Sequence, residues 1–350
     1  MVKLIQKEMR TETSELAFEP IKYTSLNYYY NILKKTFWIP EELDLSTDKL
    51  DWEKLDTNTR EFIKNILFLF SQLDGIVNEN LIEYLKKETS FIKEASHFYA
   101  MQEANETIHN ETYSLLVTTY ISDLDERRRG LDSIQHYPAI RKIADWAWKW
   151  MSPEVTTLER LMAFICVEGI IFQNPFAGIF YLKKSNALPG LIIANEWISR
   201  DEGVHTNFGI ELSKILEREY SSPPDDEVME IEDSSGGEST PVFEKLSQEK
   251  AHLIVREAVN ASIEFTRDSM KTDLVGLKAD ELIEYVKNIA DDILTRRGFE
   301  KIYNVENPLT WMASVGMVNK SNFFEKKVTE YAKVDVSINY DSVLSGNINF

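Results

Sequence analysis

Apolar residues recur every three or four positions along most of this chain, which is the period of an amphipathic helix. The pattern runs from about residue 57 to 215 and returns from about 247 to 300, and Phe62, Ile66 and Phe70 give one example of the apolar stripe. The two-residue alternation that is typical of strands is scarce. The periodicity therefore predicts an all-α protein made of long helices.

Proline, glycine and small polar residues divide these helical stretches. The Ser-Thr-Asp cluster at 46–48 predicts a helix start. Pro153 and the pair Pro189-Gly190 predict helix boundaries. Pro175 lies inside an apolar run, so we expect it to kink a helix rather than end it.

Three segments do not share the helical pattern. Residues 1–36 are polar and mixed, and we interpret them as an N-terminal arm. Residues 221–246 are rich in Ser, Pro, Gly and acids, so they are predicted to be a flexible insertion. Residues 334–350 have no usable period and are predicted to form a flexible C-terminal tail. The remaining range, 37–333, is predicted to be one helical domain with a short last helix at about 321–332.

Acidic residues outnumber basic ones by a wide margin. The chain has 58 Asp and Glu against 39 Lys and Arg, a formal net charge of -19. A nucleic-acid partner is therefore not expected, because phosphate binding needs a basic surface. Hydrophobic residues make up 43% of the chain, which allows a sizeable core, and some of the acids could lie inside it to neutralise bound cations.

No segment predicts a membrane partner. Residues 1–8 lack the apolar core of a signal peptide, and the longest apolar stretch, 161–172, is too short to span a bilayer. The single cysteine, Cys166, cannot form an internal disulfide or a zinc cluster, and we interpret it as a small buried hydrophobic residue. These features are typical of a soluble cytoplasmic protein in a reducing compartment.

One arrangement occurs twice along the chain: an acid in an apolar helix is followed, about one helical hairpin later, by Glu-x-x-His. The two copies are Asp74 with Glu106 and His109, and Glu168 with Glu202 and His205. The spacing from the acid to the Glu-x-x-His motif is nearly the same in both copies. Two equivalent helix pairs are the usual way to build a four-helix bundle.

Glu-x-x-His alone is weak evidence, because the sequence contains four such pairs. Glu94 and His97 lie near several lysines, so a partly exposed helix face is expected there. Glu249 and His252 follow the predicted insertion and are expected at a solvated helix start. The other two pairs lie in long helical stretches with apolar residues on the same face. There the (i, i+3) spacing lets both side chains reach one ion.

The two lone acids give the stronger signal. Glu168 is the only charge within 161–172, and Asp74 follows the apolar run 66–73. An unpaired buried carboxylate is costly or takes up a proton, and four of them in one core would repel each other. Two divalent cations would remove this repulsion, and carboxylate with imidazole ligands suits iron or manganese. The alternative is a plain helical bundle with paired core acids and satisfied histidines.

Tyr113 stands four residues after His109, hence on the same helix face. A phenol beside an oxidising di-metal centre can itself be oxidised. The alternative is an ordinary core tyrosine whose hydroxyl is hydrogen-bonded.

Several segments of the chain resemble the small subunit of class I ribonucleotide reductase, in its eukaryotic and large-DNA-virus form. They are FWIPEELDLS at 37–46, DGIVNENL at 74–81, ETIHNETYSLL at 106–116, VEGIIF at 167–172, ISRDEGVH at 198–205 and KSNFFEKKVTEY at 320–331. The resemblance implies a ferritin-like helical bundle and a homodimer. It also implies two iron ions, with manganese possible, that react with O₂ and leave a stable tyrosyl radical.

The resemblance further implies a role for individual residues. One metal would be held by Asp74, Glu106 and His109 and the other by Glu168, Glu202 and His205, beside the radical tyrosine Tyr113 and the apolar pocket residues Phe172, Phe176 and Ile198. Radical transfer would start at Trp38, use Asp201 as the link to His109, and continue through Tyr331, with Tyr340 as the alternative. The tail would dock on the large subunit through Phe350.

The implied activity is that of the small subunit of ribonucleoside-diphosphate reductase, which is active only with a large subunit that holds the substrate and the reactive thiols. The chain departs from the family pattern in three ways: the insertion 221–246 has no counterpart there, one extra residue lies between Asp74 and Glu106, and the tail ends less acidically. Three alternatives stay open: another di-iron oxidase such as a desaturase or hydroxylase, an iron-storage ferroxidase, and a helical interaction protein without catalysis.

Overall fold

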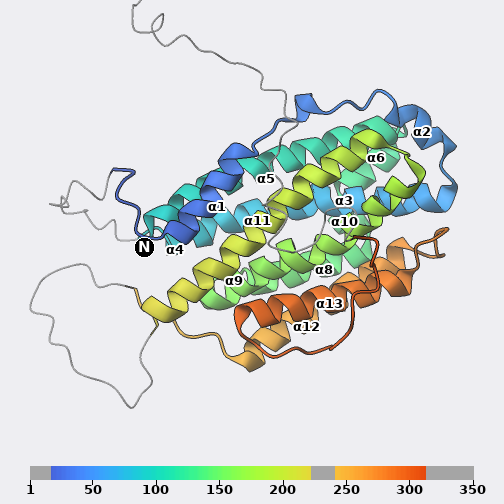
Figure 1. Ribbon diagram of the computed structural model, residues 1–350. Helices are drawn as coiled ribbons and strands as arrows, with labels where there is room; N and C mark the ends of the chain where they lie inside the picture. The colour runs from blue at the N-terminus through green and yellow to red at the C-terminus, as the bar shows by residue number, and fades with distance from the viewer. Residues whose placement is uncertain (1–16, 222–240, 313–350) are drawn as a thin grey trace, which may run out of the picture.

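The computed structural model describes residues 17–221 and 241–312, which Figure 1 shows as stacked helices. Within these two ranges there is no β-strand, only two isolated bridges, so the prediction of an all-α protein is confirmed. Some expectations lie outside the described residues: those for the helix at 321–332, the tail 334–350, Tyr331, Tyr340 and Phe350.

Helices follow one another with short connections through the described residues. In chain order they are α1 (Thr24–Lys35), the 3-10 turn η2 (Pro40–Glu42), α2 (Asp48–Lys54), α3 (Thr57–Asn80), the π-helical turn η3 (Leu81–Leu85), α4 (Lys86–Glu88), α5 (Lys93–Tyr120), α6 (Leu124–Leu131), α7 (Ser133–His136), α8 (Pro138–Trp150), α9 (Thr157–Cys166), the π-helical turn η4 (Val167–Ile171), α10 (Gln173–Phe180), the 3-10 turn η5 (Tyr181–Ser185), α11 (Pro189–Glu219), α12 (Gln248–Ser269) and α13 (Ala279–Arg297).

Four helical segments form the centre of the bundle. α3 packs on α5, α5 packs on α11, and α11 packs on α9 and on η4, which continues α9. α12 and α13 pack against η4 as well, and Figure 1 shows them below α8, α9 and α11. Each of the four central segments carries one or two of the predicted metal ligands. The helix pairs expected from the internal repeat are therefore present.

One helical stretch of the described residues, Thr157–Ser185, is long and apolar enough to cross a membrane, but its most apolar part is entirely buried inside the bundle. It includes α9, η4 and α10, and it continues through Pro175 after the wider turn of η4. Cys166 is buried in it, as expected. Pro153 lies between α8 and α9, and Pro189 begins α11, so both predicted boundaries are confirmed.

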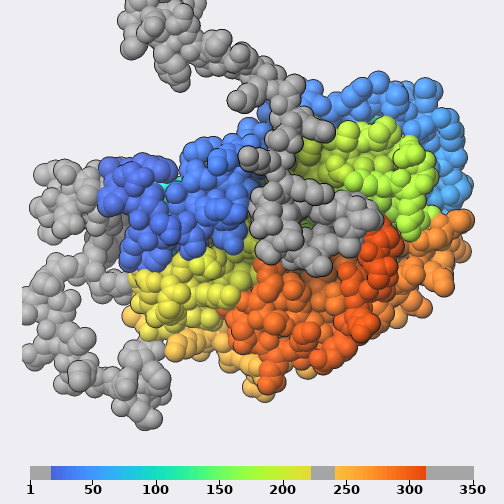
Figure 2. Space-filling view, viewed as in Figure 1, coloured from blue at the N-terminus to red at the C-terminus, as the bar shows by residue number. Residues whose placement is uncertain are grey.

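α1 falls within the range that the sequence analysis treats as an N-terminal arm. Its buried Leu26 and Leu33 pack it against α5 and α11, and Figure 2 shows this blue region directly above the yellow end of α11. The described residues on either side of 222–240 lie together, because the Phe243 N–H donates to the Tyr220 carbonyl at 2.7 Å.

The start of α11 is held by a buried carboxylate from the N-terminal part of the chain. Asp48 accepts hydrogen bonds from the N–H groups of Gly190 and Leu191 at 2.9 and 2.8 Å, and from the Tyr120 hydroxyl at 2.6 Å. A side chain at Gly190 would meet the Asp44 carbonyl oxygen at 2.7 Å, which explains the glycine. This cap therefore supports the start of the helix that carries two of the predicted ligands.

Asp48→Ala is expected to lower the free energy of unfolding by about 2–4 kcal/mol, because it removes a helix cap and leaves three buried donors without an acceptor. Denaturant unfolding of the full-length protein measures this. Glu53→Ala is the control, since Glu53 lies in the same helix, is exposed, and pairs with Arg60 at 4.0 Å, away from the start of α11. Equal stability of the two variants would contradict the capping role.

Candidate metal centre

The six predicted ligands meet at the centre of the bundle, and all six are buried. They are Asp74 on α3, Glu106 and His109 on α5, Glu168 in η4, and Glu202 and His205 on α11. In both Glu-x-x-His pairs, the (i, i+3) spacing turns the two side chains to the same side of the helix. Side chains from four helical segments thus converge on one small volume.

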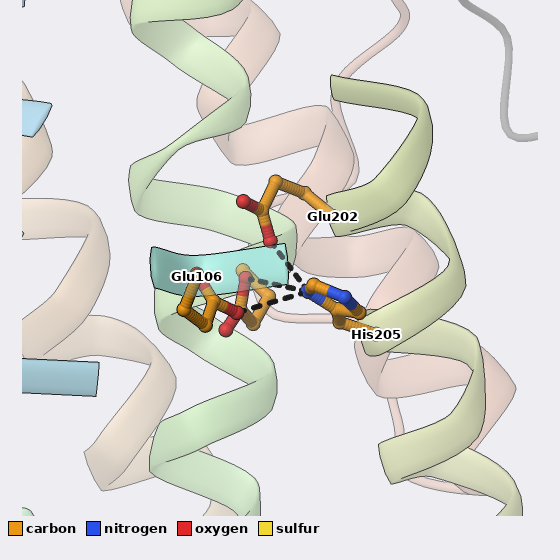
Figure 3. A group of neighbouring side chains, drawn as sticks. Glu106, Glu202 and His205 are labelled. Carbon is orange, nitrogen blue, oxygen red and sulfur yellow. Dashed lines mark hydrogen bonds and ion pairs between the residues drawn. The ribbon is translucent and has the colours of Figure 1, made fainter. Parts of the chain in front are cut away.

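The ligand atoms form two overlapping groups. Atoms within 4.8 Å of one another come from Asp74, Glu106 and His109 in one group, and from Glu106, Glu168, Glu202 and His205 in the other. Figure 3 shows His205 Nδ1 pointing at Glu106 Oε1 and Glu202 Oε2, at 3.1 and 2.9 Å. His109 Nδ1 lies 3.0 Å from Glu202 Oε1. Glu106 and Glu202 therefore each lie near both His109 and His205, and each could bridge two ions.

Several carboxylate oxygens of the cluster have no hydrogen-bond partner among the described residues. They include both oxygens of Asp74, Oε2 of Glu106 and Oε2 of Glu168. Buried oxygens without partners are costly, and their negative charges repel one another. Oxygen and imidazole ligands without a thiolate are the set that suits iron or manganese. The residues present therefore fit a pair of divalent cations.

The pKa values of the cluster reflect the same charge problem. Burial, with repulsion from neighbouring carboxylates, raises the pKa of Asp74 and Glu168 well above the ordinary value. Burial alone would lower the pKa of His109 and His205, but the surrounding carboxylates raise both well above the usual range. Protons neutralise the cluster when cations do not, so metal binding must displace protons.

A glutamine joins the two halves of the cluster. Gln102 stands one turn before Glu106 on α5, and its Nε2 donates to Glu106 Oε1 at 3.2 Å and to Glu168 Oε1 at 3.4 Å. Gln102 was not among the residues predicted from the sequence. The available signal was its position on the ligand face of α5, four residues before Glu106.

Asp201 links the cluster to Trp38. Its Oδ2 accepts a hydrogen bond from Trp38 Nε1 at 2.8 Å and lies 3.4 Å from His109 Nε2. The Trp38 ring also stacks on the His109 ring, with centroids 5.9 Å apart. Because Nε2 of His109 faces Asp201, its Nδ1 is left to face the carboxylates of the cluster.

Asp201 stays ionised in this buried position. Burial would raise its pKa, but the Arg200 charge and the hydrogen bonds from His109 and Trp38 lower the pKa below the ordinary value. Arg200 contacts the other oxygen, Oδ1, at 3.0 Å. Asn105 Nδ2 adds a further hydrogen bond to Oδ2 at 3.2 Å. Each of these groups can act as a donor, so their arrangement favours an ionised carboxylate at position 201.

Tyr113 is buried close to the cluster. Its hydroxyl has no hydrogen-bond partner in the described part of the protein. Burial, and next the charge of Asp74, raise its pKa well above the ordinary value. Its ring stacks on Phe70 at 4.7 Å, a residue that the sequence analysis did not single out.

Two of the predicted pocket residues, Phe172 and Phe176, pack against the ring of Phe70, the residue that stacks on Tyr113. The Phe70 ring lies 5.4 Å from Phe172 and 4.8 Å from Phe176, and both of these side chains are buried, as is Ile198. Tyr113 is thus buried, with an aromatic ring against its own ring and the charges of the cluster carboxylates close enough to raise its pKa.

The other two Glu-x-x-His pairs are not part of this centre. Glu94 accepts the N–H groups of Lys22 and Tyr23 at the start of α1. It is therefore buried, and the expectation of exposure is wrong for this residue because α1 covers it. His97 is half-buried and stacks on Phe18. Glu249 is exposed in the first turn of α12, so the predicted solvated helix start is confirmed.

Glu106→Ala is expected to weaken the binding of both ions by more than about 100-fold, because Glu106 belongs to both ligand groups. Anaerobic titration calorimetry of the full-length protein with Fe(II) or Mn(II) measures this. Glu103→Ala is the control, since Glu103 lies on the same helix and pairs with Lys86 outside the cluster. Retention of two tight sites by Glu106→Ala would contradict the bridging assignment.

The family model for the small chain of ribonucleotide reductase matches residues 15–308. The ribonucleoside-diphosphate reductase small chain of Variola virus is 39% identical over 331 residues, which are 95% of each chain. The corresponding protein of Nicotiana tabacum is 39% identical, over 94% of this chain and 90% of that one. The Dictyostelium discoideum small subunit is 38% identical, over 95% and 91%.

Solved structures show the same fold. The ribonucleotide reductase Rnr4 homodimer of Saccharomyces cerevisiae is 26% identical, with a TM-score of 0.67 over 92% of this chain and 91% of that one. The ribonucleotide reductase R2 subunit of Clostridium botulinum is 22% identical, with a TM-score of 0.70 over 84% and 88%. The sequence resemblance and the ferritin-like fold class are thus confirmed, and this chain belongs to the ribonucleotide reductase small-chain family.

Proposed function

We propose that this small subunit binds two iron ions in the buried cluster and uses them, with O₂, to oxidise Tyr113 to a stable radical. The large subunit would then draw on that radical to reduce ribonucleoside diphosphates to deoxyribonucleotides. The observation that carries the proposal is the closed space that holds a carboxylate–histidine cluster beside a buried tyrosine whose hydroxyl has no partner.

The ligands divide into two sets. Asp74, Glu106 and His109 would hold one ion, and Glu168, Glu202 and His205 the other, with Glu106 and Glu202 placed to bridge them. When bound, the ions would allow O₂ to serve as the oxidant, which is chemistry that no organic side chain can supply. The protein contributes the ligand geometry and the exclusion of water.

Tyr113 would lose one electron and its hydroxyl proton together. Its raised pKa keeps the phenol protonated beforehand, so the proton must leave as the electron does. Asp74 raises that pKa more than any other carboxylate, and both of its oxygens lack hydrogen-bond partners, so it is the proposed proton acceptor. The rings of Phe70, Phe172 and Phe176 keep water and reductants from the radical.

The oxidising equivalent would leave through His109, Asp201 and Trp38, which contact one another in that order. Tyr331 is the proposed next carrier, with Tyr340 as the alternative, and the tail ending in Phe350 is the proposed docking segment for the large subunit. Homodimer formation is proposed by analogy with the yeast homodimer.

A di-iron oxidase that acts on its own substrate is the second candidate. Such an enzyme needs an open channel to the metals, whereas all six ligands are buried here. The two hollows described on the surface lie beside Lys183 and Lys214, and neither is lined by a residue of the cluster. A buried site with an unpartnered tyrosine favours the radical function.

The test is electron paramagnetic resonance of metal-free, full-length protein after addition of Fe(II) and air. A stable tyrosyl signal supports the proposal. Iron uptake without any organic radical would overturn it and favour the second candidate. Loading with Mn(II) in parallel shows which metal supports radical formation.

Removal of residues 334–350 is expected to abolish nucleotide reduction with the large subunit and to leave the Tyr113 radical unchanged, since the proposed docking segment is lost while the metal centre remains. Activity assays and spin quantification on the same samples measure both effects. Full activity without the tail would contradict the docking role.

A further inference from the structure

The line of aromatic rings that begins at His109 continues past Trp38. The Trp38 ring lies 5.9 Å from His109 on one side and 5.2 Å from Trp197 on the other, in each case between centroids. Trp38 is only 2% exposed, whereas Trp197 is half-buried and therefore reaches solvent. Trp197 stands on α11 one turn before Asp201, the residue that binds Trp38.

We propose that Trp197 is a redox relay that carries the oxidising equivalent between buried Trp38 and the surface of this subunit. The inference rests on the proposed function, because that function places the oxidising equivalent on Trp38. Neither the resemblance nor the ligand pattern assigns a role to Trp197. Its position follows only from the packing of the two indoles.

The transfer step balances as follows. Oxidised Trp38, an indole radical cation, takes one electron from Trp197 and returns to its neutral form with its Nε1–H still bonded to Asp201. Trp197 becomes the radical and releases its indole N–H proton to water, which its partial exposure permits. An external donor of the phenol or thiol class then returns one electron and one proton to Trp197.

The two indoles are placed for this exchange in both directions. The Asp201 carboxylate stabilises positive charge on Trp38, so a hole that enters at Trp197 moves readily inward. Loss of the Trp197 proton to water favours the outward direction, in which the oxidising equivalent moves from Trp38 to Trp197. A phenylalanine at 197 would keep an aromatic ring against Trp38 but could not be oxidised, which separates a relay from simple packing.

The test uses the full-length protein without metal, so that it does not depend on Tyr113. A soluble ruthenium tris-bipyridine photo-oxidant with a sacrificial acceptor is illuminated with the protein, and peptide mass spectrometry then measures oxidation of Trp38 and Trp197. In the wild type, oxidation at both indoles is expected. Trp197→Phe is expected to lose oxidation at Trp38, and Trp197→Tyr, which is redox-active, is expected to restore it.

Trp148→Phe is the matched control, because Trp148 is 41% exposed but lies on α8. It should leave Trp38 oxidation unchanged. Undiminished Trp38 oxidation in Trp197→Phe would overturn the relay. An equal loss of Trp38 oxidation in Trp197→Phe and Trp197→Tyr would also overturn it, because it would show that Trp197 matters only for packing. Absence of a Tyr113 radical in iron-loaded wild type would refute the proposed function instead, while the photo-oxidation result would still decide whether the indole pair conducts.

Discussion

Tyr113→Phe is expected to bind metal as the wild type does and to give no stable radical after addition of Fe(II) and O₂. The change removes one hydroxyl that has no hydrogen-bond partner, so the free energy of unfolding should change by less than about 1 kcal/mol. The phenyl ring keeps its contact with Phe70 but cannot lose a proton with the electron. Electron paramagnetic resonance, with iron quantified in the same sample, measures the loss.

Tyr99→Phe is a close control for this variant. Tyr99 lies on the same helix, is buried, and also has a hydroxyl without a partner, yet its ring packs against Phe98 and Phe208 rather than Phe70. It should keep the full radical signal. A persisting tyrosyl signal in Tyr113→Phe, or its loss in Tyr99→Phe, would show that the radical lies elsewhere.

The sequence predicted the ligand cluster well because an acidic residue on the apolar face of a predicted helix must be buried. Glu168 is the only charge in its apolar run, and Asp74 follows another such run, so both had to face the core and needed a counter-charge. Helix boundaries at Pro153 and Pro189 were equally predictable, because proline cannot continue a helix from its interior.

Contacts between residues far apart in the chain could not be predicted in this way. Trp38 and Asp201 are 163 residues apart, and periodicity does not tell which side chains meet across two elements. Only the family resemblance suggested that pair. Asp48 belonged to a cluster that predicts a local helix start, and the pattern did not show that its side chain also caps α11, far along the chain. Local lysines likewise suggested exposure of Glu94, because the sequence does not show that α1 covers it.

Asp201→Asn is expected to leave the Tyr113 radical in place and to lower nucleotide reduction with the large subunit by about 10–100-fold, as is typical when the partner of a metal-ligating histidine is altered. The groups around Asp201 approach as donors, including Arg200 at Oδ1 and Trp38 at Oδ2. An asparagine offers one acceptor and one donor, so one of these contacts must fail. Asparagine is preferred to alanine because alanine would leave Arg200 as an unpaired, largely buried charge.

A double-mutant comparison separates the route from a general defect. Trp38→Phe should also keep the Tyr113 radical while nucleotide reduction falls steeply to a low, measurable rate. If Asp201 acts through Trp38, the variant with both changes should be no less active than Trp38→Phe alone, since the second change then removes nothing further. Losses that multiply would show that the two residues act independently. Loss of the radical itself in Asp201→Asn would place Asp201 in the assembly of the metal centre rather than on the route that leads away from it.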